Sequence, residues 1–273
     1  MQLQNARAKF EKQGIKIAAI SYDSPAILKD FSERHKIDFP LLADPDSRII
    51  REYDVLNAEA TGMTKGMARP GYFYIDASGS IREKYFGIKY TDRFTPNNVI
   101  GRLFPELSEE VTQNISAPHL QLSLQQSDRD VITGNRVRLV AEIELPPGVH
   151  VYAPGVQGYR PIHLALNEAA GLDFAPATYP EPKILYLPAI DEHVPVFEGK
   201  FRVAQDVILH QAKPPSPGAP PAPGGETLSV TGELQYQACD DKVCYPPASV
   251  PVAWNFQVFP IDLVRAPENI QHK

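Results

Sequence analysis

Two cysteines separated by four residues are the side chains of this sequence best suited to chemistry. Cys239 and Cys244 are the only cysteines among 273 residues, and they lie in the stretch QYQACDDKVCYPP, residues 235–247. Strand-like sequence precedes and follows them, and residues 240–242 (Asp-Asp-Lys) form the expected turn, because Asp side chains bond to nearby backbone amides. Residues that face each other across a hairpin have Cα atoms roughly 4.5–5.5 Å apart, and a disulfide accepts roughly 4.4–6.8 Å. The pair can therefore close into a disulfide with little movement of the backbone.

Such a pair could do three kinds of work. A structural disulfide here would close a very short loop, so it would remove little entropy from the unfolded chain. A redox pair would instead exchange its disulfide with the thiols of a partner protein. A zinc site is the third use, but two cysteines supply only half of the usual four ligands. The spacing alone leaves all three uses open.

Histidines are the remaining candidates for a metal site near the cysteines. His150, His163 and His193 could add ligands for zinc or Cu(I), but their spacing matches no metal motif. No phosphate-binding loop, Ser-His-Asp arrangement or paired-carboxylate signature accompanies them. The sequence therefore predicts no metal and no cofactor.

The cysteine stretch resembles the active-site motif of the N-terminal periplasmic domain of the thiol:disulfide interchange protein DsbD. In that family a strand ends in Q-x-C, a short turn follows, and the second cysteine opens C-Y-P-P. Three further stretches resemble family segments in the same order: HVYAPGVQGYRP (150–161), TYPEPK (178–183) and VFEGKFRVAQDVIL (196–209). The resemblance covers about residues 116–260.

The resemblance implies thiol–disulfide exchange in which Cys244 faces the partner and Cys239 resolves the mixed disulfide. It also places Phe197 at the position of an aromatic residue in a cap loop that covers the cysteines, although a plain core phenylalanine is the other interpretation. Tyr152 and Tyr245 are candidate neighbours of the pair. The residues alone do not rank the cysteines, because the two aspartates of the turn would raise a thiolate's pKa and the lysine would lower it.

Charge and hydropathy restrict the partners and the compartment. The net charge of −6 argues against nucleic acid, and no apolar run approaches the roughly 20 residues of a membrane span. The amino terminus has no apolar core of a signal peptide, yet a working disulfide pair is typical of an oxidising compartment. The resemblance implies a periplasmic or other extracytoplasmic location. It implies dithiol or disulfide redox proteins as partners, either thioredoxin-like proteins or a membrane electron donor.

The elements of the first 104 residues alternate between helix and strand. Apolar spacing and caps predict each one, with Ser24 and Thr95 as N-caps, a buried parallel strand at 15–23 and Gly79 in the turn of a hairpin. The predicted elements are helix 2–13, strand 15–23, helix 24–36, strand 39–42, helix 46–53, hairpin 71–87 and helix 95–104.

This order resembles the thioredoxin-like fold of the peroxiredoxin family (alkyl hydroperoxide reductase and thiol-specific antioxidant). The matching pieces are FEKQGIKIAAISYDSP, DFPLLADPD and ARPGYFYIDASGSIR, within residues 1–104. The resemblance implies that Arg69 is a remnant of an active-site arginine, unless it is an ordinary surface residue. It also implies that Pro70 occupies the place of the fold's cis-proline, so we expect a cis Arg69–Pro70 bond.

The first half departs from that family in its chemistry. The family's reactive cysteine lies at the start of the first long helix, after two strands, whereas this sequence begins inside that helix and has no cysteine before Cys239. Peroxide reduction needs a thiolate. We therefore expect residues 1–104 not to act as a peroxidase. The half is either the remainder of a longer chain, which would also account for a missing signal peptide, or a vestigial scaffold.

After residue 104 the pattern changes to short alternating strands, which predicts an all-β immunoglobulin-like sandwich over residues 119–260 with Trp254 in its core. Residues 105–118 are polar and predict a linker, residues 213–226 a Pro-rich loop, and residues 261–273 a frayed tail. The predicted strands are 119–126, 135–145, 150–153, 161–166, 183–187, 201–209, 226–237 and 251–259.

The sequence thus predicts an incomplete α/β thioredoxin-like domain followed by an all-β immunoglobulin-like sandwich. Two functions stay open. One is a thiol–disulfide oxidoreductase or electron relay in an antioxidant or disulfide-reduction pathway. The other is a binding module with an inert disulfide beside a vestigial redoxin half.

Overall fold

Two compact units divide the chain. The computed structural model describes residues 1–87, 89, 91–105, 107, 110–187, 191–210, 225–262 and 264–271, apart from the side chains of Met63 and Glu110. The first unit consists of Met1–Phe104 with Ile261–Lys273, and the second of Pro105–Pro260. The carboxyl-terminal residues, expected to fray, thus group with the first unit, where His35 Nε2 lies 3.9 Å from a carboxylate oxygen of Asp262.

The first unit is α/β, as predicted, and its helices begin where the caps predict. The Ser24 hydroxyl accepts the Ile27 N–H at 3.3 Å, and the Thr95 hydroxyl accepts the Asn98 N–H at 3.1 Å. A proline follows each cap, where its missing N–H costs no hydrogen bond. The elements are α1 (Gln2–Lys12), β1 (Ala19–Ser21), α2 (Pro25–His35), β2 (Leu41–Ala43), α3 (Arg48–Glu52), η1 (Gly62–Thr64), β3 (Gly71–Ile75), β4 (Ile81–Phe86), β5 (Arg93–Phe94), α4 (Pro96–Leu103) and η2 (Glu268–Ile270).

The strand expected to be buried at 15–23 is short and partly exposed. β1 has three residues, and Ile20 is 42% exposed. Its partner is the parallel strand β2, where Leu42 is 50% exposed. β3 and β4 form a separate antiparallel pair. A parallel strand is buried when helices cover both faces of a wide sheet, and the two-stranded β1–β2 sheet leaves apolar side chains exposed instead.

The prediction of a cis Arg69–Pro70 bond is wrong. No cis peptide bond occurs in the described residues, so this bond is trans, the isomer that X–Pro bonds prefer. The Arg69 N–H donates to the Val55 carbonyl at 2.7 Å just before β3 begins.

The second unit is all-β, and each of the eight predicted strands is present. Five further strands were not predicted: β6, β8, β12, β14 and β17. The strands are β6 (Glu110–Ala117), β7 (Leu120–Gln126), β8 (Asp130–Ile132), β9 (Asn135–Glu144), β10 (His150–Tyr152), β11 (His163–Leu166), β12 (Leu172–Phe174), β13 (Lys183–Leu187), β14 (Glu192–Glu198), β15 (Lys200–Leu209), β16 (Glu226–Tyr236), β17 (Ala238–Cys239) and β18 (Ala248–Phe259).

Three sheets organise these strands. Their orders are β12-β15-β9-β7-β6, β11-β16-β18-β8 and β13-β14-β10-β17. The main core contains Trp254, which is 0% exposed and donates its indole N–H to the Gln125 carbonyl at 3.0 Å. This confirms the prediction that Trp254 is a core residue. The predicted Pro-rich loop at 213–226 lies outside the described residues up to residue 224, and β16 begins at Glu226.

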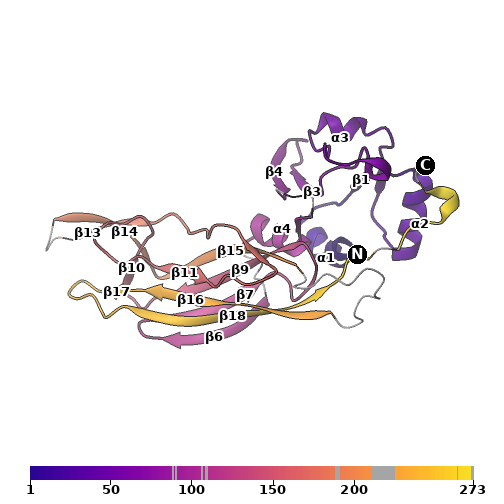
Figure 1. Ribbon diagram of the computed structural model, residues 1–273. Coiled ribbons are helices and arrows are strands. Elements are labelled where there is room, and N and C mark those ends of the chain that lie inside the picture. The colour runs from indigo at the N-terminus through magenta and orange to yellow at the C-terminus, as the bar shows by residue number, and fades with distance from the viewer. Residues whose placement is uncertain are drawn as a thin grey trace. The chain divides into compact units, whose positions relative to one another are not determined.

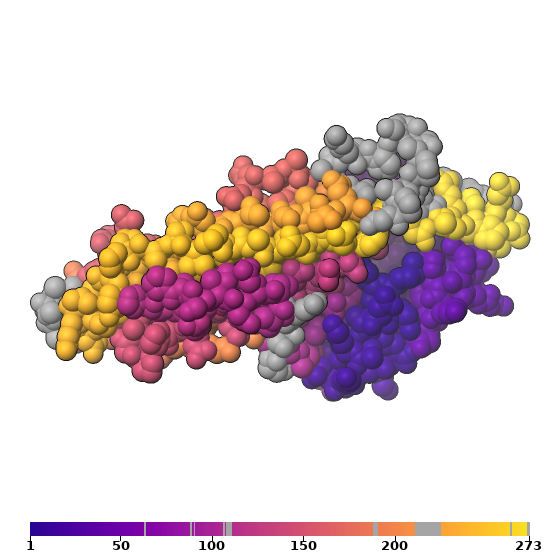
Figure 2. All heavy atoms as spheres, turned by 90° about the horizontal axis from the view of Figure 1, so that it is seen from below, coloured from indigo at the N-terminus to yellow at the C-terminus, as the bar shows by residue number. Residues whose placement is uncertain are grey.

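The predicted linker at 105–118 is largely wrong, because β6 occupies most of it. β6 pairs with β7 in antiparallel register, with Ile115 opposite Leu122, and both Ile115 and Ala117 pack against the main core. In the ribbon and space-filling views β6 runs alongside β18 (Figures 1 and 2). The strand was missed because Gln113 interrupts the alternating apolar positions between Val111 and Ile115.

The sheet β13-β14-β10-β17 lies at one end of the second unit and carries the cysteines (Figure 1). Facing residues of an antiparallel sheet point to the same side, and successive residues alternate between sides. One side contributes Val151, Phe197 and Ala238 to the main core. The other carries a small buried group, here called the disulfide cluster, of Tyr152, Val194, Val196 and Cys239.

Candidate functional site

A tight hairpin holds the two cysteines in a disulfide, as the sequence predicts. Cys239 ends β17 and pairs across the hairpin with Cys244, with Cα atoms 4.0 Å apart and an S–S bond of 2.05 Å. The Asp240 N–H donates to the Val243 carbonyl at 2.9 Å, which closes the turn. The backbone hydrogen bonds therefore hold the cysteines opposite each other.

The Asp240 side chain builds this turn. One carboxylate oxygen accepts the Lys242 and Val243 N–H groups at 2.8 and 2.9 Å, and the other accepts the Tyr245 hydroxyl at 2.7 Å. These bonds favour the charged carboxylate and, with the tyrosine hydroxyl as the largest contributor, lower the pKa of Asp240 to about 2. The same bond raises the pKa of Tyr245. Both carboxylate oxygens of Asp240 are thus used in hydrogen bonds that stabilise the turn.

The two sulfur-bearing residues differ in exposure. Cys239 is 1% exposed, because it lies on β17 beside β10 within the disulfide cluster. Cys244 lies beyond the turn and is exposed. Solvent therefore contacts Cys244 and is almost excluded from Cys239.

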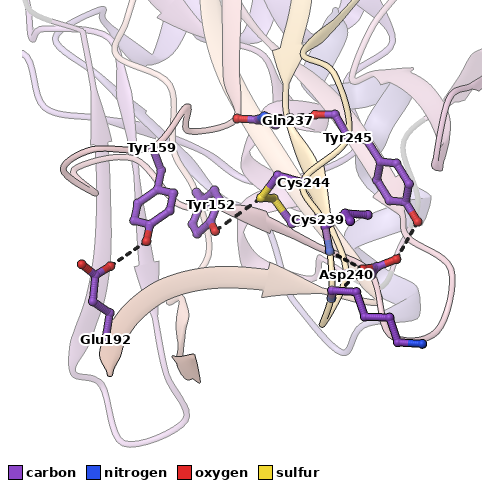
Figure 3. The surroundings of a disulfide bond; sticks show 10 residues. Tyr152, Tyr159, Glu192, Gln237, Cys239, Asp240, Cys244 and Tyr245 are labelled. Carbon is purple, nitrogen blue, oxygen red and sulfur yellow. Dashed lines mark hydrogen bonds between the residues drawn. A yellow bond between two sulfur atoms is a disulfide. The ribbon is translucent and has the colours of Figure 1, made fainter. Parts of the chain in front are cut away.

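Two tyrosines cover one side of the disulfide. Tyr152, on β10, is 2% exposed and places its hydroxyl 3.8 Å from Cys244 Sγ. Its ring stacks on Tyr159 with centroids 4.2 Å apart, and the Tyr159 hydroxyl donates to Glu192 at 2.6 Å. Figure 3 shows Tyr152 between Tyr159 and the disulfide. Burial raises the pKa of Tyr152, and the bond to Glu192 raises the pKa of Tyr159 to about 12, so both hydroxyls keep their protons.

Tyr245 lies on the other side of the disulfide, with Asp240 (Figure 3). Its carbonyl accepts the Gln237 side-chain amide at 3.0 Å, and its ring stacks on His119 with centroids 3.7 Å apart. The structure thus brings both tyrosines named from the sequence to the disulfide. Tyr159, Glu192 and His119 were missed, and only Tyr159 lay in a stretch that already resembled the DsbD family.

Phe197 does not cover the disulfide. It is 4% exposed, pairs with Val151 in the β10–β14 register and stacks on Phe201 within the main core. Cys239 pairs with His150, the neighbour of Val151, and therefore points to the opposite side of the sheet. The predicted cap position is part of strand β14, and strand alternation turns its aromatic ring into the core.

The three histidines considered as metal ligands lie in different settings. His150 is 2% exposed on β10, His163 lies on β11 of another sheet, and His193 lies on β14 beside Tyr186. In the part of the chain that the structure describes, no group of three or more His, Cys, Asp or Glu side chains could hold a metal. Across the same residues, no helix has both the length and the apolar character needed to cross a membrane.

Arg69 and Pro70 belong to the first unit. The Arg69 side chain is exposed and forms no hydrogen bond or ion pair with the described residues. Nothing in that unit gives it a thiol to stabilise, because residues 1–104 contain no cysteine.

Comparison with known proteins divides the chain in the same way. Residues 1–84 match the AhpC/TSA family, and residues 121–253 match the family described as thiol:disulfide interchange protein DsbD, N-terminal. Alkyl hydroperoxide reductase C of Staphylococcus epidermidis is 30% identical over 84 residues, which are 29% of this chain and 42% of the relative. The putative peroxiredoxin bcp of Haemophilus influenzae is 28% identical over 91 residues, 33% of this chain and 59% of the relative. The chain therefore spans about half the length of the curated relatives it matches.

Two solved structures are similar to parts of the chain. The N-terminal periplasmic domain of ScsB from Proteus mirabilis has a TM-score of 0.38 and 15% identity, covering 55% of this chain and 52% of that one. The reduced DsbD N-terminal domain of Neisseria meningitidis has a TM-score of 0.27 and 18% identity, covering 44% and 82%. On the family matches, this chain joins a region related to the AhpC/TSA peroxiredoxins to a region related to the N-terminal domain of DsbD.

Proposed function

We propose that this protein is a thiol–disulfide oxidoreductase that relays electrons between dithiol proteins through Cys239 and Cys244. The observation that carries the proposal is the unequal exposure of the two sulfur-bearing residues, with Cys244 exposed and Cys239 buried. A structural disulfide has no need for an accessible sulfur, whereas exchange requires one sulfur that a partner thiolate can reach.

The chemistry follows from that asymmetry. In the reduced protein the Cys244 thiolate attacks a partner disulfide, a mixed disulfide forms and one partner sulfur leaves as a thiolate. Cys239 then attacks Cys244 Sγ, which restores the internal disulfide and releases the second partner thiolate. Two electrons pass to the partner. A dithiol donor then reduces the Cys239–Cys244 disulfide by the same steps in reverse.

The surroundings of the disulfide support selective exchange. Tyr152 and Tyr159 cover one side, and the Tyr152 hydroxyl can donate to a thiolate on Cys244, 3.8 Å away. A hydrogen bond to the charged form lowers a thiol's pKa and increases the thiolate fraction at neutral pH. Attack is then confined to the open side of Cys244.

The family matches guide the choice of partners and compartment. DsbD is named as a thiol:disulfide interchange protein, and the similar domain of ScsB is described as periplasmic. We accordingly propose thioredoxin-like proteins or a membrane electron donor as partners, and the periplasm as the compartment. Because residues 1–104 contain no cysteine, we assign the thiol chemistry to the second unit and no peroxidase activity to the first.

The decisive experiment is a redox titration of the pair. The protein is equilibrated with graded glutathione or dithiothreitol buffers, its thiols are alkylated, and the mass shift gives the reduced fraction. A midpoint between about −180 and −270 mV, the range of exchange-active proteins, supports the relay. A pair that stays oxidised to below about −300 mV contradicts it and indicates a structural disulfide in a binding module.

The assignment of the cysteines has its own test. A Cys239→Ser variant keeps the exposed thiol but cannot resolve, so it should accumulate mixed disulfides with a thioredoxin-like protein. The matched Cys244→Ser variant keeps only the buried thiol and should accumulate far less. Equal trapping by the two variants would contradict the roles proposed here.

A further inference from the structure

His150 is a buried imidazole that faces Cys239 directly. The two residues are register partners in the antiparallel β10–β17 pair. Directly opposite residues in such a pair have Cβ atoms roughly 4.5–5.5 Å apart and point to the same side of the sheet. His150 is 2% exposed, and its ring meets Tyr152 edge-on with centroids 5.5 Å apart. The imidazole therefore lies on the same side of the sheet as the disulfide cluster, across the strand pair from Cys239.

One nitrogen of this imidazole is buried without a partner. His150 Nε2 is shielded from solvent and forms no hydrogen bond with the described residues. A buried polar atom without a partner costs stability, and an apolar side chain of similar size would avoid that cost. In the oxidised protein Cys239, the residue opposite, cannot donate a hydrogen bond to His150 Nε2, because a disulfide sulfur carries no proton.

The charges around His150 explain how it would respond to reduction. Burial lowers the pKa of His150, while Glu198 on β14 and Asp240 and Asp241 in the turn act in the opposite direction. Reduction adds a further negative charge when Cys239 becomes a thiolate. A negative charge on the residue directly opposite favours the protonated imidazole.

We propose that His150 Nε2 takes up and returns the proton of Cys239 as the disulfide opens and closes. This inference rests on the proposed exchange chemistry and adds a proton-handling residue to it.

The step balances as follows. A partner thiolate attacks Cys244 Sγ, a partner–Cys244 S–S bond forms and the Cys239–Cys244 bond breaks. The electron pair of that bond leaves on Cys239 Sγ. One proton enters from solvent and is shared between Sγ and Nε2. In the reverse direction Nε2 accepts the Cys239 proton as its sulfur attacks the mixed disulfide, and then returns it to solvent.

The test compares the rate of disulfide reduction by dithiothreitol between pH 5 and 9, corrected for the thiolate fraction of the reagent. We expect His150→Phe to slow reduction about 100-fold at pH 7, the lower end of what a positioned proton-transfer group contributes. His150→Gln, which can donate a hydrogen bond but cannot take up a proton, should recover part of the rate without the wild-type pH dependence. Trp254 fluorescence verifies that each variant is folded.

His193→Phe is the matched control. His193 lies on the neighbouring strand β14, is exposed, and its ring is tilted against that of Tyr186 with centroids 4.8 Å apart. Its replacement should leave the rate within twofold of the wild type. A His150→Phe rate within twofold of the wild type would overturn the proposal.

A second measurement separates proton transfer from packing. Nitrogen-15 NMR of the histidine rings, in the oxidised and reduced full chain, should show His150 gaining protonated character on reduction. An unchanged His150 signal would overturn the proposal even if the variant is slow. Concentrated dithiothreitol reduces stable disulfides as well as labile ones, so these experiments test the role of His150 at any midpoint potential of the pair. The proposed relay function is tested separately, by the midpoint potential itself.

Discussion

The hydroxyl of Tyr152 lies beside the sulfur of Cys244, the exposed residue of the pair. It is 3.8 Å from Cys244 Sγ, and burial keeps the phenol protonated, so it can act as a donor. Stacking on Tyr159 fixes its ring, and the hydrogen bond from Tyr159 to Glu192 fixes the second ring in turn. The donor is thus positioned before any thiolate forms.

Replacing Tyr152 with Phe removes this donor and keeps the ring. The pKa of the Cys244 thiol should rise, because its charged form loses a hydrogen bond, and alkylation of the reduced protein at pH 7 should slow about fivefold to tenfold. The measurement is the iodoacetamide rate against pH. Tyr186→Phe, on the exposed strand β13, is the control and should leave the rate unchanged. A normal rate for Tyr152→Phe would show that its hydroxyl does not stabilise the thiolate.

At this scale the sequence predicts the reacting atoms better than their surroundings. The cysteine pair and its turn follow from local spacing, since hairpin partners are close in the chain. Tyr159 and His150 reach the disulfide only through strand pairings between distant segments, which no local pattern encodes. Phe197 was misplaced for a related reason, because the resemblance suggested a loop where β14 continues and strand alternation decides the direction of the side chain.

The hairpin that carries the cysteines is held by a carboxylate as well as by the disulfide. Asp240 accepts two backbone N–H groups and one hydroxyl, and none of these bonds needs the S–S bond. The turn should therefore keep the thiols close together after reduction and raise their effective concentration for reoxidation.

Asp240→Ala should weaken the disulfide by removing this preorganisation. We expect the equilibrium constant for disulfide formation to fall about tenfold, which makes the midpoint potential about 30 mV less negative. The redox titration described above measures it. Asp241→Ala removes a charge from the same turn but none of these hydrogen bonds, and its midpoint should stay near that of the wild type. Equal shifts in both variants would point to charge rather than to the turn.

The same carboxylate predicts a dependence on pH. Folding lowers the pKa of Asp240 from 3.8 to about 2, so its charged form stabilises the folded state above pH 4. That contribution is lost as the pH falls from 4 through 2. In urea denaturation followed by Trp254 fluorescence, the stability difference between wild type and Asp240→Ala should be full at pH 7 and shrink towards pH 2. A difference that is constant with pH would exclude the carboxylate as its source.

Close strand packing gives a stability prediction for the sandwich. A Cβ at Gly232, in β16, would lie 2.3 Å from the Ala165 carbonyl oxygen and 2.8 Å from Leu166 Cα in β11. Gly232→Ala should therefore destabilise the second unit by about 1–3 kcal/mol. Urea denaturation followed by Trp254 fluorescence reports the loss. Thr231→Ala, at the exposed neighbouring position, should cost less than about 1 kcal/mol, and equal losses would contradict the steric explanation.

The strands of ten or more residues were predicted, whereas several of the shortest were not. β9, β15 and β16 have ten or eleven residues, enough for alternation between apolar and polar positions to be clear. β8, β12 and β17 have two or three residues, too few for any period. β17 nevertheless carries Cys239. This strand forms through its pairing with β10, which lies far from it in the sequence.

In the whole molecule, the residues described around the disulfide all come from the second unit. A fragment of residues 105–260 should therefore fold and keep a midpoint potential within about 15 mV of the full chain, which is about a threefold change in equilibrium constant. Redox titration of both proteins tests this. A larger difference would show that the first unit influences the pair. The full chain with both Cys239→Ser and Cys244→Ser has no thiol and serves as the negative control for alkylation.

The return of residues 261–273 to the first unit has a consequence for proteolysis. The chain leaves that unit after Phe104 and re-enters it after Pro260, so the second unit is tethered at both ends. A protease that cuts near Pro260 therefore releases only a short peptide and leaves residues 1–104 joined to the second unit. A cut near Phe104 instead leaves the second unit attached to residues 261–273 alone.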